Sequence, residues 1–60
     1  MIPPGEKDIL RGMIKSLQVT IEYGVKDTML VTYDLDLSQR FNHIYNELES
    51  ILEIVDDINI

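Results

Sequence analysis

Apolar residues recur along the second half of the chain in alternating steps of three and four, the spacing that places side chains on one side of a helix. The series consists of Phe41, Ile44, Leu48, Ile51, Val55 and Ile58. The pattern continues upstream as a seven-residue repeat of Leu30, Leu37, Ile44, Ile51 and Ile58. It predicts a second helix over about 27–58, capped by Asp27 or Thr28, whose apolar side packs against another helix.

The first half of the chain also has apolar residues at helical spacing, namely Leu10, Met13, Ile14, Leu17 and Ile21. Residues 1–5 include two prolines and a glycine, which predicts an extended lead. Glu6 and Asp8 place negative charge where a helix N-terminus favours it, and Gly24 suits a helix C-terminus. We therefore expect a first helix over about 6–23. Within it, Gly12 costs about 1 kcal/mol relative to Ala unless close helix packing uses its missing side chain.

Two helices joined by a short turn predict an all-α fold, an antiparallel helical hairpin, in one small domain of residues 1–60. The alternative is an α+β fold in the order helix, β-hairpin, helix. It rests on two stretches, 19–25 and 31–37, where apolar and polar residues alternate as they do in strands. The seven-residue repeat across both halves of the second helix favours the all-α fold, and only Asp34 interrupts the companion apolar positions.

The expected lengths of the two helices differ. About 18 residues span roughly 27 Å and about 30 residues span roughly 45 Å, so the second helix extends past the first. Apolar residues near its end then lack a partner within the chain: Ile51, Leu52, Ile54, Val55, Ile58 and Ile60. An uncovered apolar strip of this size predicts a homodimer or a partner helix.

Length supports association, because a chain of 60 residues buries only about 60% of the surface that its unfolded form exposes, which leaves its stability marginal. Cysteine is absent and His43 is the only histidine, so we expect neither a disulfide nor a metal site. The net charge is −6, and residues 27–60 hold eight acidic side chains against one basic side chain, Arg40. That charge opposes binding to nucleic acid. With no long apolar run and no signal-peptide pattern, we expect no membrane association and a cytoplasmic protein.

Three polar residues, Ser38, Gln39 and Asn42, lie beside the apolar side of the second helix. At spacings of three and four they share one helix surface. Their amide groups can both donate and accept hydrogen bonds, so Gln39 or Asn42 can orient a water molecule. The plain alternative is that these residues are the solvated side of a helix.

The segments Glu22-Tyr23-Gly24-Val25 and Leu37-Ser38-Gln39-Arg40-Phe41-Asn42-His43-Ile44 resemble the small aspartyl-phosphate phosphatases that regulate sporulation in bacilli. Members of that family are two-helix hairpins with a Ser-Gln-Glu-Leu-Asp signature on the second helix. Ser38 and Gln39 match the signature and Phe41 replaces its leucine. Asn42 stands where the family has aspartate, which leaves open whether this chain is an enzyme.

The resemblance implies that the chain removes phosphate from the aspartyl-phosphate of a sporulation response regulator. Gln39 and Asn42 are then the candidate catalytic residues. The candidate partner-binding residues are Ser38, Arg40, Asn46, Ile51, Val55 and Ile58. The chain is expected to need no cofactor of its own, because Mg²⁺ is held by the response regulator.

A function of another class fits the same sequence. An acidic helical protein with an uncovered apolar strip is typical of a non-enzymatic interaction or inhibitor module, which dimerises or binds a partner helix.

Overall fold

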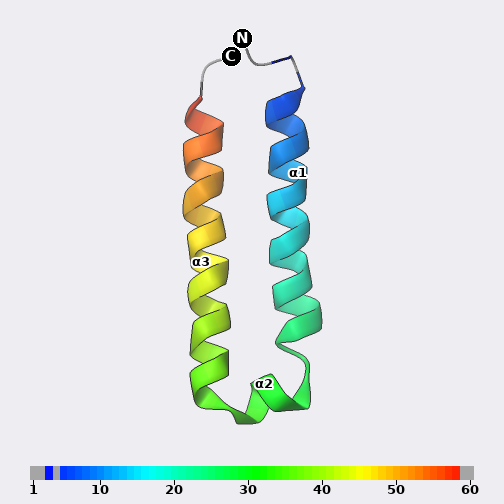
Figure 1. Ribbon diagram of the computed structural model, residues 1–60, viewed down its shortest axis with the longest axis vertical. Coiled ribbons are helices and arrows are strands. Elements are labelled where there is room, and N and C mark those ends of the chain that lie inside the picture. Colours follow the sequence, from blue (N-terminus) through cyan, green and yellow to red (C-terminus); the bar gives the residue numbers. More distant parts are fainter. Residues whose placement is uncertain (1–2, 4, 59–60) are drawn as a thin grey trace.

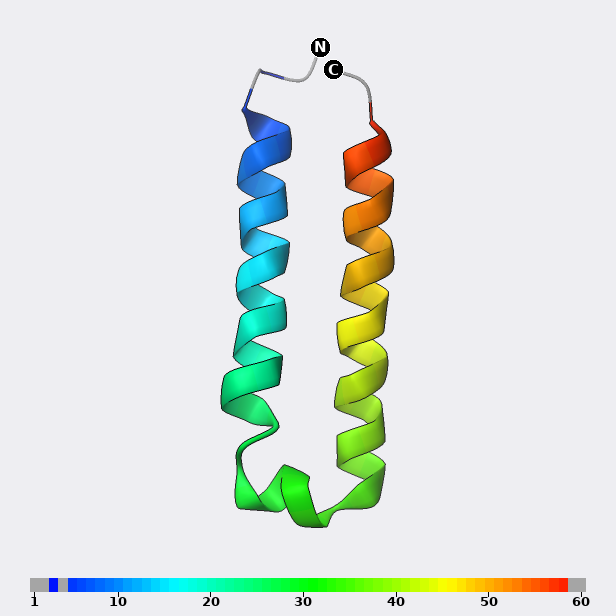
Figure 2. The ribbon, with the colours of Figure 1, turned by 180° about the vertical axis from the view of Figure 1, so that it is seen from behind.

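The computed structural model describes residue 3 and residues 5–58, and in this part of the chain all regular structure is helical. The elements are α1 (Glu6–Val19), the π-helix η1 (Thr20–Val25), α2 (Met29–Tyr33) and α3 (Leu35–Asp57). Figures 1 and 2 show α1 and α3 side by side and running in opposite directions, with α2 lying across one end. The all-α prediction is confirmed. The alternative with a β-hairpin is wrong, since the stretches 19–25 and 31–37 contain no strand.

The first helix begins where it was predicted, but α1 ends at Val19 and η1 continues the helical path to Val25. Gly5 precedes it with φ of 94°, a left-handed conformation that suits glycine, and Glu6 and Asp8 lie in the first turn. Gly24 does not end the helix, because it lies inside η1. The last bond of η1 runs from the amide of Lys26 to the carbonyl of Ile21 at 3.0 Å, which is the wider π-helical pairing.

The predicted single helix over 27–58 is divided into α2 and α3. Thr28 caps α2, since its hydroxyl oxygen accepts a hydrogen bond from the Val31 amide at 3.4 Å. Asp34 has extended backbone angles, and its carboxylate accepts from the Leu37 amide at 3.1 Å. An aspartate that bonds the backbone in this way ends one helix and caps the next. The fold therefore has a short third helix that the two-helix prediction lacked.

The contact between α1 and α3 uses only part of the predicted apolar sides. The buried residues of α1, η1, α2 and α3 are Ile14, Gln18, Ile21, Val31, Leu52 and Val55. Phe41, Tyr45 and Leu48 are half-buried along α3. Six predicted seam residues instead remain exposed: Leu10, Met13, Leu17, Ile44, Ile51 and Ile58. Each long helix has more apolar surface than one neighbouring helix can cover, so one stripe is buried and the adjacent stripe is not.

The predicted overhang of the second helix is absent. Together α1 and η1 comprise 20 residues, close to the 23 of α3. The Lys7 ammonium group donates to the carbonyls of Asp56 and Ile58 at 3.0 and 2.9 Å, so the start of α1 lies level with the end of α3. Leu52 and Val55 were predicted to be uncovered, but both are buried. Ile60 lies outside the described residues.

Polar contacts run along one edge of the seam. The buried Gln18 amide donates to the Glu49 carboxylate at 2.8 Å and to the Tyr45 carbonyl at 3.5 Å. Nearer the open end, Arg11 forms an ion pair with Asp56. These contacts fix which stripe of each helix faces the other. Within residues 5–58, no helix combines the length and the apolar character that crossing a bilayer requires.

Candidate functional site

The polar residues Ser38, Gln39 and Asn42 lie in the first three turns of α3, close to the end of the molecule that α2 closes. Asp34 sets the start of this helix and thereby the direction in which each following side chain projects. Successive residues are rotated by about 100° around the axis. Ser38, Gln39, Asn42 and Asn46 consequently project from α3 within an arc of about 100°, which we call the amide strip.

The amide strip is open to solvent at its outer members. Gln39, Asn42 and Asn46 are exposed, whereas Ser38 is half-buried at the edge of the seam. The residue that caps α3 is Asp34, four residues before Ser38. The strip therefore presents amide groups, rather than a hydroxyl group, to any molecule that approaches α3.

Arg40 projects from the other side of α3, about 200° from Ser38. Its Nε donates to the Asp36 carboxylate at 3.0 Å, and both side chains are more than two-thirds exposed. An exposed pair at this spacing contributes only a few tenths of a kcal/mol. The guanidinium group is thus released from Asp36 at little cost when another anion is offered.

A shallow hollow of about 450 Å³ lies on the outer side of α3, lined by Asp36, Gln39, Arg40, His43 and Ile44. Gln39 is the one member of the amide strip that borders it, since Asn42 projects from the adjacent part of the helix surface. Among the described residues, no group of His, Cys, Asp and Glu is arranged to hold a metal ion. The site offers neutral amides and a weakly held arginine on an open helix surface.

The three apolar residues predicted to bind a partner differ in accessibility. Ile51 and Ile58 are 38% and 39% exposed, but Val55 is only 5% exposed because it packs in the seam. Val55 therefore contacts α1 in this conformation, and a partner that approaches α3 from outside meets the two isoleucines instead.

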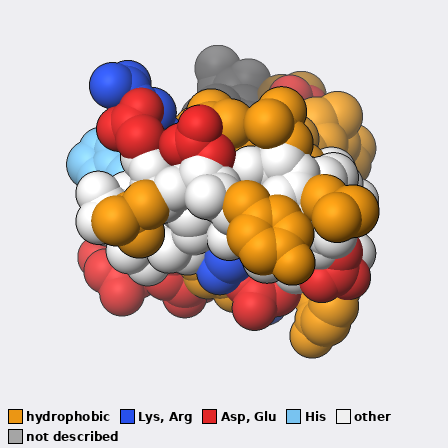
Figure 3. Space-filling view, turned by 90° about the horizontal axis from the view of Figure 1, so that it is seen from below, with side chains coloured by type: hydrophobic (Ala, Val, Ile, Leu, Met, Phe, Trp, Pro, Cys, Tyr) orange, Lys and Arg blue, Asp and Glu red, His pale blue; other side chains and the backbone are white. Residues whose placement is uncertain are grey.

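Sequence reasoning missed an apolar surface beside the amide strip. Large side chains more than 70% exposed gather at the end closed by α2, and we call them the turn-end surface: Tyr23, Met29, Leu30, Tyr33 and Leu35. Figure 3 views this end directly and shows separate apolar groups among acidic ones. Leu35 precedes Gln39 and Asn42 by four and seven residues, so it heads the amide strip. The apolar residues on both sides of Asp34 could have indicated this surface, but their alternation with polar residues suggested a strand.

Comparisons with known proteins give no family model that matches this chain, no significantly similar curated protein and no significantly similar solved structure.

Proposed function

We propose that this protein is a small regulator that docks on a response regulator and promotes hydrolysis of its aspartyl-phosphate. The observation that supports the proposal is the amide strip, in which Gln39 and Asn42 are exposed on adjacent turns of α3. The resemblance of residues 37–44 to the sporulation phosphatases identifies the substrate class. The two long helices then act as an antiparallel hairpin that presents α3 to the partner.

Hydrolysis of the aspartyl-phosphate requires one contribution from this chain, which is to position the attacking water. A water oxygen attacks phosphorus in line, the bond from phosphorus to the aspartyl oxygen breaks, and inorganic phosphate leaves with the carboxylate regenerated. The charge of the transferred group is balanced by Mg²⁺ and a lysine of the response regulator, so positioning the water is the remaining task. An amide oxygen accepts a hydrogen bond from that water and its NH₂ group donates to a phosphoryl oxygen.

The shape of the candidate site agrees with a helper role. The hollow beside Gln39 is open and shallow, so an aspartyl-phosphate enclosed in a cleft of its own protein must be reached by a projecting helix. The exposed turn-end surface, with Leu35 at the head of the amide strip, supplies apolar contact area for such docking. The proposal places the protein in the cytoplasm, where response regulators work.

Phosphate release from a phosphorylated response regulator tests this proposal. We expect stoichiometric protein to accelerate release, Gln39→Ala to reduce the rate at least about tenfold, and Asn42→Asp to raise it, because a carboxylate accepts more strongly than an amide. Ser50→Ala, exposed on the same helix, is the matched control and should leave the rate unchanged. No acceleration by the wild-type protein contradicts the enzymatic proposal.

The second candidate function is a non-enzymatic interaction or inhibitor module. The turn-end surface favours it, because five large apolar side chains exposed at one end suit binding more than catalysis. Titration calorimetry with the same response regulator separates the two candidates. Binding without phosphate release, weakened by Tyr33→Ser and not by Gln39→Ala, supports the module.

A further inference from the structure

Both long helices carry a second apolar stripe that their mutual contact leaves uncovered. Its members are 38–60% exposed, and we call them the apolar flank: Leu10, Met13 and Leu17 of α1 with Ile44, Ile51 and Ile58 of α3. Ile9 and Ile54, 57% and 64% exposed, lie at its outer edges. None of these residues belongs to the amide strip or to the turn-end surface.

The two halves of the apolar flank lie on the same side of the molecule. On α1 its members are rotated about 40–100° from the buried Ile14, and on α3 about 80–120° from the buried Leu52 in the same rotational sense. The two helices face each other and run in opposite directions. A rotation in the same sense away from their contact therefore brings both stripes to the same side of the pair. The hydrogen bond from Gln18 to Glu49 lies on the opposite rotational side of both reference residues.

Charge is distributed unequally between the two sides. On α1 the surface next to the apolar flank is uncharged from Ile9 to Leu17, with Gly12 and Ser16 beyond its edge. The opposite side of the pair carries Lys15, the two carboxylates of the polar contacts, Glu49 and Asp56, and one further acidic residue, Glu53. On α3, Arg40 and Glu47 lie beside the flank, about 120° and 140° from Leu52 in the same sense. These two charges are opposite in sign, so a second molecule of net charge −6 meets less repulsion here than on the opposite side.

The molecule exposes more surface than a compact monomer of its mass. The molecule exposes 4796 Å², whereas a folded monomer of 7.0 kDa exposes roughly 4,000 Å² by the scaling of surface with mass. The elongated shape, 46 × 16 × 12 Å, accounts for part of the excess.

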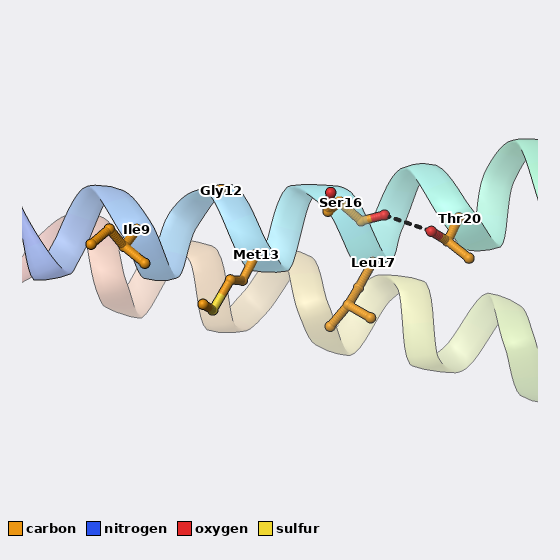
Figure 4. Close-up of a pocket in the computed structure, with 6 residues that line it drawn as sticks. All are labelled: Ile9, Gly12, Met13, Ser16, Leu17 and Thr20. Carbon is orange, nitrogen blue, oxygen red and sulfur yellow. Dashed lines mark hydrogen bonds between the residues drawn. The ribbon is translucent and has the colours of Figure 1, made fainter.

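A shallow groove of about 610 Å³ follows the outer edge of the apolar flank along α1. Figure 4 shows its lining residues, with Ile9, Met13 and Leu17 spaced along one ridge and Gly12 and Ser16 on the opposite edge. A Cβ atom added to Gly12 would meet nothing within 4 Å. Packing inside the molecule thus gives no reason for a glycine here, whereas close approach of another helix does.

We propose that the apolar flank binds a second copy of this chain and that the two copies form a four-helix bundle. A two-fold axis brings the same surface of both molecules together, so one apolar stripe suffices for the whole contact. The buried stripe of each copy remains as it is, and the flank becomes the second layer of a shared core. This proposal does not depend on the phosphatase function: the amide strip stays outside the bundle, whereas Ile51 and Ile58 then contact the second copy rather than a response regulator.

Sedimentation and thermal unfolding over a wide concentration range test the dimer. We expect a dimer whose melting temperature rises with protein concentration. Met13→Glu should weaken association at least about 100-fold, because the interface would bury an unpaired charge. Val19→Glu is the matched control: Val19 is 56% exposed on the same helix, close to the 60% of Met13, but lies away from the flank, and the variant should remain a dimer.

Cross-linking keeps the test valid if Met13→Glu fails to fold. The chain has no cysteine, so Leu17→Cys introduces a single thiol on the flank and Val19→Cys a single thiol away from it. A short bismaleimide should join Leu17→Cys chains into dimers in high yield and Val19→Cys chains in background yield. A wild-type monomer with a concentration-independent melting temperature, or equal cross-linking of the two variants, overturns the proposal.

Discussion

Gln18 shows at the scale of a single residue how polar chemistry orients the two long helices. It is only 7% exposed and occupies a position in the seam where an apolar side chain would be expected. Its amide reaches Glu49, which remains exposed, so the hydrogen bond joins a buried donor to a hydrated acceptor. Such a bond adds little net stability but penalises any rotation that leaves the donor buried and unpaired.

Replacing Gln18 by leucine should therefore stabilise the fold. The leucine adds apolar contact in the seam, while Glu49 returns to water without penalty, and we expect a gain of about 1 kcal/mol. Gln18→Ala, which removes the bond and leaves a void, should lose about 1–2 kcal/mol. Urea unfolding of both variants measures the difference. A leucine variant less stable than wild type would show that the polar contact contributes more than its burial costs.

Two glycines should respond oppositely to the same substitution. Gly12→Ala lies in the body of α1 with free space around it, so it should gain about 1 kcal/mol from helix propensity. Gly5→Ala should instead lose about 1 kcal/mol, because φ at Gly5 is 94° and disfavours a Cβ atom. Thermal unfolding at a low, fixed protein concentration compares the two variants. A loss on Gly12→Ala at that concentration contradicts the expectation.

At the scale of elements, helix-forming patterns were readable from the sequence but the break between α2 and α3 was not. Apolar residues at helical spacing continue through 30–58, and Asp34 was noticed only as a polar interruption of that series. In the structure its carboxylate bonds the Leu37 amide and starts α3. An aspartate inside a helical pattern can be a solvated side chain or a cap, and spacing alone does not distinguish the two.

Asp34→Ala tests the cap directly. Loss of the side-chain acceptor should destabilise the first turn of α3 by about 1 kcal/mol, whereas Asp34→Asn keeps an acceptor oxygen and should lose only a few tenths. Circular dichroism during thermal unfolding gives the stabilities. Equal losses in the two variants would point to the charge of Asp34 rather than to its hydrogen bond.

The sequence also predicted only in part which apolar stripe of each long helix is buried in their contact. Each long helix carries two adjacent apolar stripes, and both satisfy the spacing rule, as Ile14 and Leu17 illustrate on α1. The pairing of Gln18 with Glu49 and of Arg11 with Asp56 depends on which residues come level across the pair. That alignment is a property of both helices together. The amide strip, in contrast, lies on one helix, and its shared surface follows from spacing alone.

At the scale of the whole molecule, the end opposite α2 is held together by side chains of α1. The Lys7 ammonium group bonds two carbonyls that the last turn of α3 cannot satisfy internally, and Arg11 pairs with Asp56 one turn further in. Cations at a helix C-terminus are favourable because they offset the negative end of the helix dipole. The two long helices are therefore joined covalently at one end and electrostatically at the other.

Lys7→Met should loosen that end without disturbing the other. We expect amide hydrogen exchange in the last turn of α3 to accelerate several-fold, because the local opening free energy falls by about 0.5–1 kcal/mol. Exchange near Thr28 and Asp34 should not change. Lys15→Met, exposed in the middle of α1, is the matched control. Uniform acceleration along α3 would mean that Lys7 supports global stability instead.

The π-helical stretch η1 also bears on how the chain tolerates changes in length. A bond from Lys26 to Ile21 encloses one residue more than an α-helical bond does, so η1 holds one surplus residue within the first long helix. Deleting the exposed Glu22 lets the local bonds re-form at α-helical spacing while Ile14 and Gln18 keep their partners. α3 has no such reserve, since a deletion there rotates every later side chain by about 100°. Changes in length are thus absorbed at η1, and the part of α3 that carries the amide strip tolerates only substitution.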